Sequence, residues 1–239
     1  MTNDWTYSIA DEIFVQFPDY VRGVVLADGL TNGPTPPELV DRLRAAEASI
    51  RERMTLETIA AFPRIASWRE AYRSAGIKPN EFRSSVEAMA RRALRSQELP
   101  SINALVDIGN VLSLHHVLPV GSHALDEVTS DLALLKATGE EEFVPFGSDQ
   151  SERPAPGEIV FVEGRTVLTR RWSWRQARHT LTLPETKTVE INIDGLPPIT
   201  KSEIETIGHE AMELVRRFCG GRMRLELLTR QNPRMSLRL

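Results

Sequence analysis

The chain has 239 residues, of which 41% are hydrophobic and 26% charged, the composition of an ordinary globular protein with a sizeable core. Its formal net charge of −4 gives no overall sign of nucleic-acid binding, and it lacks the run of about 18 apolar residues that a membrane span needs. Cys219 is the one cysteine, which excludes an intrachain disulfide and a cysteine zinc site. The first residues lack the basic and apolar regions of a secretory leader, so we expect a cytoplasmic protein. The five histidines lack the spacing of metal ligands, so we expect no metal, and we expect no other cofactor.

The N-terminal part of the chain predicts two strands and a helix. Two short apolar runs within residues 13–27, separated by a Pro-Asp pair, are typical of strands. A helix start follows, in which Thr35 caps the helix, Pro36 takes the first helical position and Glu38 completes a capping box. Apolar residues at helical spacing extend this helix to Met54.

Three further helices are predicted in the middle of the chain. The first covers residues 65–74 and ends at a glycine. The second has its apolar face within residues 86–94, and either Asn80 or Ser84 serves as its cap. A proline separates it from the third, which includes residues 103–110.

The second half of the chain carries mostly strand signals. Residues 157–174 alternate between polar and apolar types on both sides of a Glu-Gly pair, which predicts a hairpin. In such an alternating strand, Trp172 and Trp174 would share one face. Residues 179–183 and 187–193 predict two more strands.

A last helix is expected over residues 201–218. Thr200 and Glu203 form a capping box at its start, and two glycines end it. The residues after Arg222 either add a strand or fray. Because helices are interleaved with mostly antiparallel strand signals, the predicted fold class is α+β.

Charge is distributed unevenly along the sequence. Between Arg64 and Arg95 there are eight basic residues against three glutamates, and residues 170–178 hold four arginines around two tryptophans. Acidic residues concentrate instead within 126–163. A surface polarised in this way can hold a polyanion even when the total charge is negative. The alternative is that each arginine-rich helix simply has a solvated face.

One predicted helix carries an unusual row of polar residues. Asn103, Asp107 and Asn110 follow the spacing i, i+4, i+7 and therefore lie on one helix face. A carboxylate between two amides offers donors and acceptors together, which suits recognition of an α-ammonium group or of ribose hydroxyls. The same row also fits a polar network that bonds to neighbouring backbone and locks the helix to a sheet. The sequence leaves both interpretations open.

The stretch INALVDIGNVLSL and the following PVGSHALDEV resemble the B3/B4 domain of the bacterial phenylalanyl-tRNA synthetase β subunit. Asn103, Asp107 and Asn110 match a helix of that domain, and His123 matches the segment after the helix. The stretches GEIVFVEGRTVLTRRW and ETKTVEINIDG resemble later strands in the same order, so the resemblance covers residues 64–196. The stretches AYRSAGIKPNEFRSSVEAMARR and RRWSWRQARHT look like the stand-alone branch of the family, which implies a freestanding copy.

This resemblance implies a B3/B4-type fold, a β-sandwich of unusual topology with packed helices. We expect a single domain over residues 1–239, with a family core at 64–196 onto which residues 10–60 and 200–220 pack. In the synthetase, the domain is an editing site that hydrolyses the ester between a wrong amino acid, notably tyrosine, and the 3′ end of the tRNA.

Hydrolysis of an aminoacyl ester needs an oriented water, a site for the oxyanion and a grip on the terminal adenosine. The resemblance implies catalytic roles for His123, Asp107 and Asn110. We expect the aminoacyl group and the terminal nucleotide to contact Asn103, Glu87, Trp172, Trp174 and Gln176. We expect RNA phosphates to contact Arg73, Lys78, Arg83, Arg171, Arg175 and Arg178.

The stretch RRWSWRQARHT departs from the synthetase pattern. The synthetase has a glycine-rich stretch there, followed by an acidic residue that reads the tyrosine hydroxyl. Here Trp172 and Trp174 are bulky, and Gln176, Arg178 or His179 lies near the acidic position, so tyrosine specificity is not carried over. Each tryptophan either stacks on the terminal base or packs in the core.

Two other candidate residues have plain structural alternatives. Glu87 lies one helical turn from both Arg83 and Arg91, so it either faces the substrate or forms an ion pair along the helix. His123 either positions water or the ribose, or is a histidine at a loop turn.

The predicted function is therefore binding of tRNA and hydrolysis of mischarged aminoacyl-tRNA in trans, with no membrane or metal partner. Two alternatives stay open from the sequence. One is a non-catalytic RNA-binding module that kept the fold, and the other is a protein that binds free amino acids as small-molecule ligands.

Overall fold

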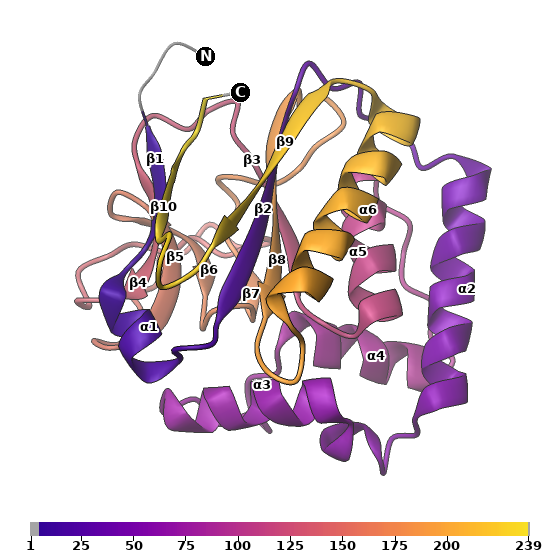
Figure 1. Ribbon diagram of the computed structural model, residues 1–239, viewed down its shortest axis with the longest axis horizontal. Helices are drawn as coiled ribbons and strands as arrows, with labels where there is room; N and C mark the ends of the chain where they lie inside the picture. Colours follow the sequence, from indigo (N-terminus) through magenta and orange to yellow (C-terminus); the bar gives the residue numbers. More distant parts are fainter. Residues whose placement is uncertain (1–4, 239) are drawn as a thin grey trace.

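The computed structural model describes residues 5–238 as two β-sheets packed face to face, with helices on the outer face of one sheet (Figure 1). The smaller sheet is antiparallel and has the strand order β3 (Val120–Ala124), β8 (Thr188–Gly195), β2 (Val21–Asp28) and β9 (Arg222–Leu228). The larger sheet has the order β10 (Arg234–Ser236), β1 (Thr6–Ile9), β4 (Leu132–Lys136), β5 (Ile159–Glu163), β6 (Thr166–Arg170) and β7 (Arg175–Gln176). In the larger sheet, β1 and β4 run parallel and the other pairs antiparallel.

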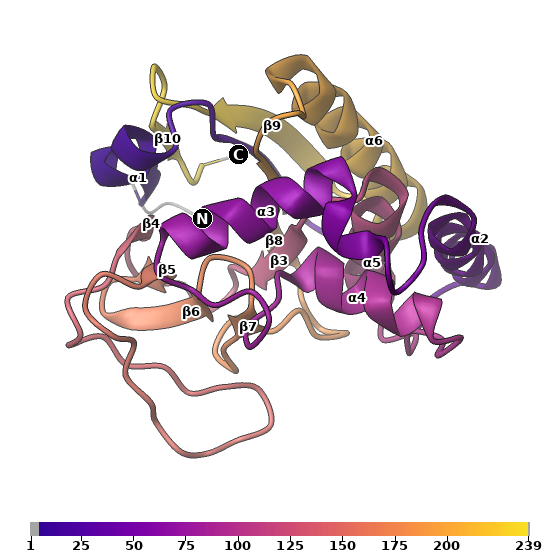
Figure 2. The ribbon, with the colours of Figure 1, turned by 90° about the horizontal axis from the view of Figure 1, so that it is seen from below.

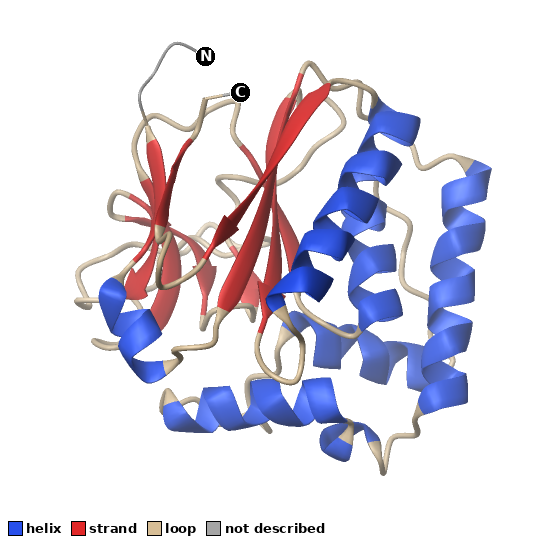
Figure 3. Cartoon of the chain, viewed as in Figure 1, coloured by secondary structure: helices blue, strands red, loops and turns tan. Residues whose placement is uncertain are grey.

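Most of the helices form a separate layer against the smaller sheet, whereas the short first helix lies beside the larger sheet, as the colours of Figure 3 show. In chain order they are α1 (Asp11–Gln16), α2 (Pro37–Arg53), the 3-10 helix η1 (Ile59–Ala61), α3 (Pro63–Ser74), α4 (Ser85–Leu94), α5 (Ala104–His116) and α6 (Lys201–Cys219). Helices α2, α4, α5 and α6 share one apolar cluster with β2 and β8. Helix α3 instead lies across one end of the molecule, where it contributes to the cluster between the two sheets (Figure 2).

Alternation along β8 separates the two sides of the smaller sheet. Val189, Ile191 and Ile193 pack against the helices, and the residues between them face the larger sheet. The space between the sheets is filled mainly by apolar and aromatic side chains, among them Phe161 and Trp172. The polar residues of β8 therefore lie at the border of an otherwise apolar core.

Several predicted elements are confirmed. The hairpin forms from β5 and β6, and helices lie at the three predicted places in the middle of the chain. Thr200 and Glu203 form the expected capping box of α6. The residues after Arg222 form strand β9. Together with two sheets and their covering helices, these elements confirm the α+β class. Within residues 5–238, no helix is long and apolar enough to cross a membrane.

Two predictions about the N-terminal region are wrong. The first half of residues 13–27 forms helix α1 rather than a strand, because Asp11 and Glu12 favour a helix start and one side of the short helix is buried. The predicted capping box at Thr35 does not form. Helix α2 begins at Pro37, and the Thr35 hydroxyl donates instead to Asp107 Oδ2 at 2.6 Å.

The predicted strand at residues 179–183 is also absent. Its alternating threonines are used in loop contacts, because Thr180 Oγ1 lies 2.6 Å from His123 Nδ1 and Thr182 Oγ1 lies 3.0 Å from Ser122 Oγ. Polar side chains that alternate in sequence therefore tie this loop to the edge of β3 instead of forming a new strand.

Candidate functional site

A cavity of about 160 Å³ lies where β3, the edge of the smaller sheet, meets the turn between β6 and β7. Its polar and aromatic lining includes Arg22, Ser122, His123, Phe161, Thr169, Trp172, Trp174, Arg175, Gln176, Asn192 and Asp194. Among the described residues, no group of three or more His, Cys, Asp or Glu side chains is placed to hold a metal ion.

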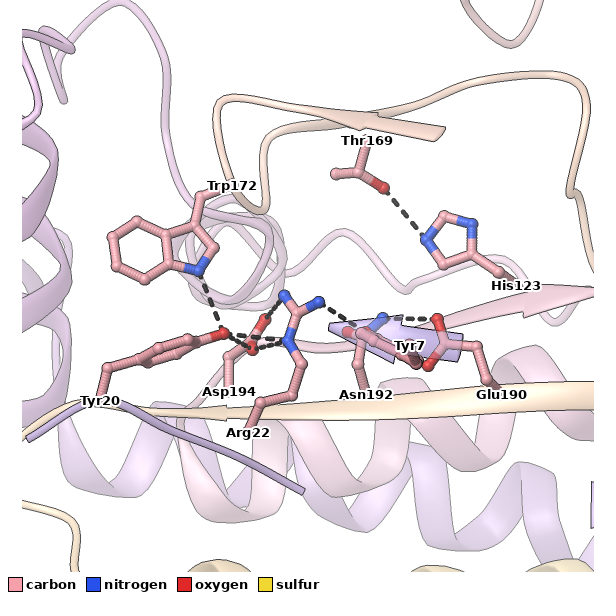
Figure 4. A network of polar contacts seen from close by, with 9 residues as sticks. All are labelled: Tyr7, Tyr20, Arg22, His123, Thr169, Trp172, Glu190, Asn192 and Asp194. Atoms are coloured by element: carbon pink, nitrogen blue, oxygen red, sulfur yellow. Dashed lines mark hydrogen bonds and ion pairs between the residues drawn. The ribbon is translucent and has the colours of Figure 1, made fainter. Parts of the chain in front are cut away.

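Strand β8 supplies the polar floor of the site. Glu190, Asn192 and Asp194 alternate with its apolar residues and face the larger sheet (Figure 4). The strand pairing places Asn192 opposite Gly121 and Glu190 opposite His123. A Cβ at Gly121 would lie 2.9 Å from Asn192 Oδ1, so the glycine leaves room for the Asn192 amide at the cavity.

A buried ion pair anchors the deep end of the cavity. Arg22 Nε lies 2.6 Å from Asp194 Oδ1, and Arg22 Nη2 lies 3.0 Å from Asp194 Oδ2, a two-point contact between side chains that are almost wholly buried. Tyr20 OH also donates to Asp194, and Arg22 Nη1 donates to Tyr7 OH at 2.7 Å. The Arg22 guanidinium still borders the cavity and has N–H groups beyond those used in these bonds.

His123 is held at both ring nitrogens. Its Nδ1 lies 2.6 Å from Thr180 Oγ1, and its Nε2 lies 3.1 Å from Thr169 Oγ1, a contact drawn in Figure 4. Burial, with the nearby charges of Arg22 and His179, lowers the pKa of His123 to about 3. The imidazole is therefore neutral at physiological pH, able to hold a hydrogen bond but weak as a proton acceptor.

Glu190 is a second buried group with a shifted charge state. Burial raises the pKa of Glu190 to about 8, although Arg22 and the bond from Asn192 favour the ionised form. Its Oε1 accepts from Asn192 Nδ2 at 3.0 Å, whereas its Oε2 has no hydrogen-bond partner within residues 5–238. Near neutral pH the group is therefore largely the uncharged acid, beside a neutral histidine.

The open edge of β3 is held by Gln176 of β7. Gln176 Nε2 donates to the Ser122 carbonyl at 2.9 Å, and Ala124 N donates to the Thr180 carbonyl at 3.0 Å. These two bonds point away from β8. By the alternation of an antiparallel strand, the N–H of Ser122 lies on the same open edge.

Residues 171–174 form a turn, so the prediction that Trp172 and Trp174 share one strand face is wrong. Arg171 and Trp172 adopt φ angles of 46° and 65°, in the left-handed region that bulky residues rarely occupy. Trp172 is buried against Phe17, Tyr20 and Trp68, whereas half-buried Trp174 packs edge-on against Phe82. The turn thus sends one indole into the core and keeps the other at the mouth of the cavity.

Comparison with known protein families decides what this chain is related to. A sequence model of the family described as "B3/4 domain" matches residues 67–220, well over half of the chain. The protein belongs to the B3/4 domain family. This confirms the resemblance found in the sequence, and the match extends beyond the expected core at 64–196 to include α6.

Other comparisons add less about this B3/4 domain. No curated protein matches the chain. One similar solved structure is the crystal structure of an N-terminal fragment of the phenylalanyl-tRNA synthetase β-subunit from Pyrococcus horikoshii, with 11% sequence identity and a TM-score of 0.48. The alignment covers 93% of this chain and 51% of the fragment, so the B3/4 domain protein spans about half of the fragment's length.

The B3/4 domain brings five of the predicted site residues to the cavity, namely His123, Trp172, Trp174, Gln176 and Arg175. The polar row of α5 does not line it. Asp107 is wholly buried and accepts hydrogen bonds from the hydroxyls of Thr35 and Ser101, each at 2.6 Å. Asn103 is the N-cap of α5, where its Oδ1 accepts from Val106 N at 3.1 Å, and Asn110 Nδ2 lies 3.4 Å from Asp107 Oδ1. This geometry matches the structural alternative, a network that fixes the start of α5.

We expect Asp107→Ala to lower the free energy of unfolding by about 1–3 kcal/mol, because the variant removes the buried charged acceptor that the Thr35 and Ser101 hydroxyls share at the start of α5. Urea denaturation of the wild type and of Asp107→Ala measures this difference, with Asn110→Ala as a milder variant of the same row. Substrate affinity and turnover should change little, because Asp107 does not border the cavity. An active-site role would show itself as lost turnover with unchanged stability.

Glu87 likewise points away from the cavity. Its Oε1 lies 2.8 Å from both Arg69 Nη1 and Arg91 Nε, and the residue is wholly buried. The ion pair along the helix, proposed as the alternative to substrate contact, is what the structure shows for Arg91. Arg83 is more distant, with its Nε at 3.9 Å from Glu87 Oε1.

The predicted RNA-binding residues are spread over the surface. Arg73, Lys78 and Arg178 pair with Glu70, Glu81 and Asp149, respectively, in exposed contacts. The Arg171 guanidinium is stacked 3.7 Å from the Phe82 ring centroid and 4.4 Å from that of Trp174. Arg175 borders the cavity. Arg83 lines a separate groove along α4, which shares Trp174 with the cavity.

The sequence analysis missed Arg22, Asn192 and Asp194. A usable signal was present in the stretch VEINID, where three polar residues share one face of a strand whose other face is apolar. An arginine inside the apolar run YVRGVVLA was a second signal, because a buried charge needs a partner. Only the pairing of β2 with β8, which sets Arg22 opposite Asp194, brings the two signals together.

Proposed function

We propose that this B3/4 domain protein binds the aminoacylated 3′ end of a tRNA and hydrolyses mischarged aminoacyl esters in trans. The observation that carries the proposal is the cavity between the two sheet edges, in which His123, Gln176 and Arg22 border one small space. The half-buried Arg175 and Trp174 of its lining suit a nucleotide, because a guanidinium group binds phosphate and an indole stacks on bases. Family membership supports the same assignment.

The proposed reaction is attack of water on the ester carbonyl. The carbonyl oxygen becomes an oxyanion, and the bond to the ribose oxygen then breaks as that oxygen takes up the proton that the water loses. The products are the free amino acid and a tRNA with a free terminal hydroxyl. In this proposal the oxyanion accepts a hydrogen bond from a donor of the cavity lining, either the Arg22 guanidinium or the edge N–H of Ser122. Because the ester is already activated, no serine or cysteine nucleophile is needed.

The role of His123 in this proposal is to position groups rather than to remove a proton. A pKa of about 3 makes the imidazole a weak base at neutral pH. Its bond to Thr169 Oγ1 fixes a hydroxyl that borders the cavity and can hold the attacking water. The neighbouring ribose hydroxyl of the substrate itself can complete the orientation of that water.

A second candidate is a binding module without catalysis, either for RNA or for a free amino acid. The observation that favours it is the bonding of His123, whose two nitrogens already have threonine partners. Asp194 is similarly occupied by Arg22 and Tyr20. A site whose groups are bonded in this way can recognise a ligand and yet release it unchanged.

The test is a panel of misacylated tRNAs incubated with excess protein, with release of the amino acid measured over time. The proposal predicts hydrolysis of at least one ester, and a roughly 100-fold lower rate for His123→Ala and Gln176→Ala, since each loses a group that orients the site. Glu205→Gln, an exposed change on α6, should behave as wild type. If every ester survives while tRNA or an amino acid binds, the second candidate replaces the proposal.

A further inference from the structure

We infer that a groove along α4 binds the phosphodiester backbone of the RNA strand whose 3′ end enters the cavity. We call it the arginine groove, and its lining residues are Glu81, Arg83, Ala88, Arg91, Arg95 and Trp174. It has a volume of about 230 Å³. The inference rests on the proposed function and adds to it a surface for the strand next to the reacting nucleotide.

The groove carries an excess of positive charge. The Glu87 carboxylate beneath it is shared by Arg69, Arg83 and Arg91, so three guanidinium groups meet one negative charge. The Arg95 side chain is exposed and has no hydrogen-bonding or ionic partner within residues 5–238, and it adds a further positive charge. Glu81 at the rim is already paired with Lys78. Such a cluster attracts a polyanion although the whole chain is negative.

The start of α4 offers a second feature that suits an anion. Its N-cap, Ser84, makes no side-chain bond to the helix, and its hydroxyl oxygen is buried without a partner among the described residues. Ser84 is 3% exposed, and the next residue, Ser85, lines the cavity. The N-terminal end of α4, with its partial positive charge, therefore lies between the cavity and the arginine groove.

Trp174 connects the two sites and favours a nucleic acid as the ligand. Its side chain lines both the cavity and the arginine groove. Arg171 stacks on its indole with a guanidinium-to-centroid distance of 4.4 Å, and Phe82 packs edge-on against it. A half-buried indole held in place beside several arginines can stack on a base while the arginines bind phosphates. An acidic peptide would bind the arginines, but its carboxylates have no ring to stack on the indole.

The experiment measures binding of a fluorescein-labelled single-stranded RNA ending in CCA, by anisotropy, over a series of salt concentrations. The test variant is Arg83→Gln/Arg95→Gln, which leaves the Arg69–Glu87–Arg91 contacts in place so that α4 keeps its support. The matched control is Arg216→Gln/Arg230→Gln, which removes the same charge from exposed positions elsewhere. If both arginines contact phosphates, the slope of log affinity against log salt becomes shallower by about 1.4 in the test variant. The control should keep the wild-type slope.

Three outcomes would overturn the inference: a test variant with wild-type slope and affinity, a control that loses as much, or oligo-glutamate that displaces the RNA as well as unlabelled RNA does. Its failure is distinguishable from that of the proposed function. If the wild type hydrolyses a mischarged tRNA and the test variant retains the same kcat/KM, the groove alone is refuted. If the groove variant loses RNA binding but the wild type hydrolyses no ester, the groove stands and the deacylase proposal falls.

Discussion

Asp194→Ala is expected to lower the free energy of unfolding by about 3–5 kcal/mol, the typical effect of breaking a buried ion pair on one side. The substitution leaves the Arg22 guanidinium buried without its carboxylate, and Tyr20 loses its acceptor as well. Water replaces the lost carboxylate only in part, because both side chains are almost wholly buried between the sheets. Denaturation with urea, followed by tryptophan fluorescence, measures the difference.

The double variant Arg22→Met/Asp194→Leu separates the charge effect from simple loss of packing. It removes both charges and fills the space with apolar atoms, so it should be more stable than Asp194→Ala alone. The contrary result is additivity, in which the double variant loses as much free energy of unfolding as Arg22→Met and Asp194→Leu lose together. The two side chains would then act independently, and this interpretation of the deep end of the cavity would be wrong.

The pH dependence of stability should reveal the two buried groups that face each other across β3 and β8. For Glu190, the folded state holds a proton up to a pKa of about 8, whereas an unfolded glutamate loses it near 4.5. Its contribution to stability is therefore complete below about pH 4.5 and falls by about 1.4 kcal/mol per pH unit as the pH rises to about 8.

His123 acts in the opposite direction. Its folded pKa of about 3 lies below the unfolded value of 6.5, so protonation of the unfolded chain lowers stability as the pH falls below about 6.5. Between about pH 4.5 and 6.5 the two effects cancel. Above that window Glu190 makes the protein less stable with rising pH, and below it His123 makes it less stable with falling pH.

Difference curves isolate these two groups from all other titrations. The stability of the wild type minus that of Glu190→Gln should decline steadily from about pH 5 to about pH 8. The stability of the wild type minus that of His123→Gln should decline from about pH 6 towards about pH 4. A flat difference curve for Glu190→Gln would mean that Glu190 is ionised and solvated, contrary to the site described above.

The extent of sequence prediction differs between the fold and the site. Helix α6 was predicted with its capping box, because Thr200 and Glu203 act within one turn and need no information from elsewhere in the chain. Thr35 carries a similar local signal, but Asp107, far away in the sequence, takes its hydroxyl. Local rules failed where a distant partner competed for the same side chain.

The site shows the same division. His123 and Gln176 were identified through family resemblance, and both border the cavity. Asp107 and Asn110 lie within α5 as predicted, whereas Asn103 is its N-cap and lies outside the helix. The direction of the Asp107 face depends on which loop covers it, and here the covering residues are Thr35 and Ser101. Arg22 became a site residue only through the register of β2 on β8, which no local pattern encodes.

The turn at Trp172 explains the remaining difference. Alternation in RRWSW predicts a continued strand, but two successive residues in the left-handed region end β6 and reverse the chain. Burial of the Trp172 ring among three other aromatic side chains offsets the strain of that backbone. The sequence pattern contains no glycine that would have indicated such a turn.

We propose that the cavity beside β3 receives the aminoacyl end of a tRNA. This binding is tested most directly by crystal structures with aminoacylated adenosine analogues whose ester is replaced by a stable amide, drawn from each class of amino acid. We expect at least one complex with the aminoacyl group between His123, Gln176 and Arg22, and the adenosine beside Trp174. An analogue seated elsewhere on the protein, with this cavity empty, would contradict it.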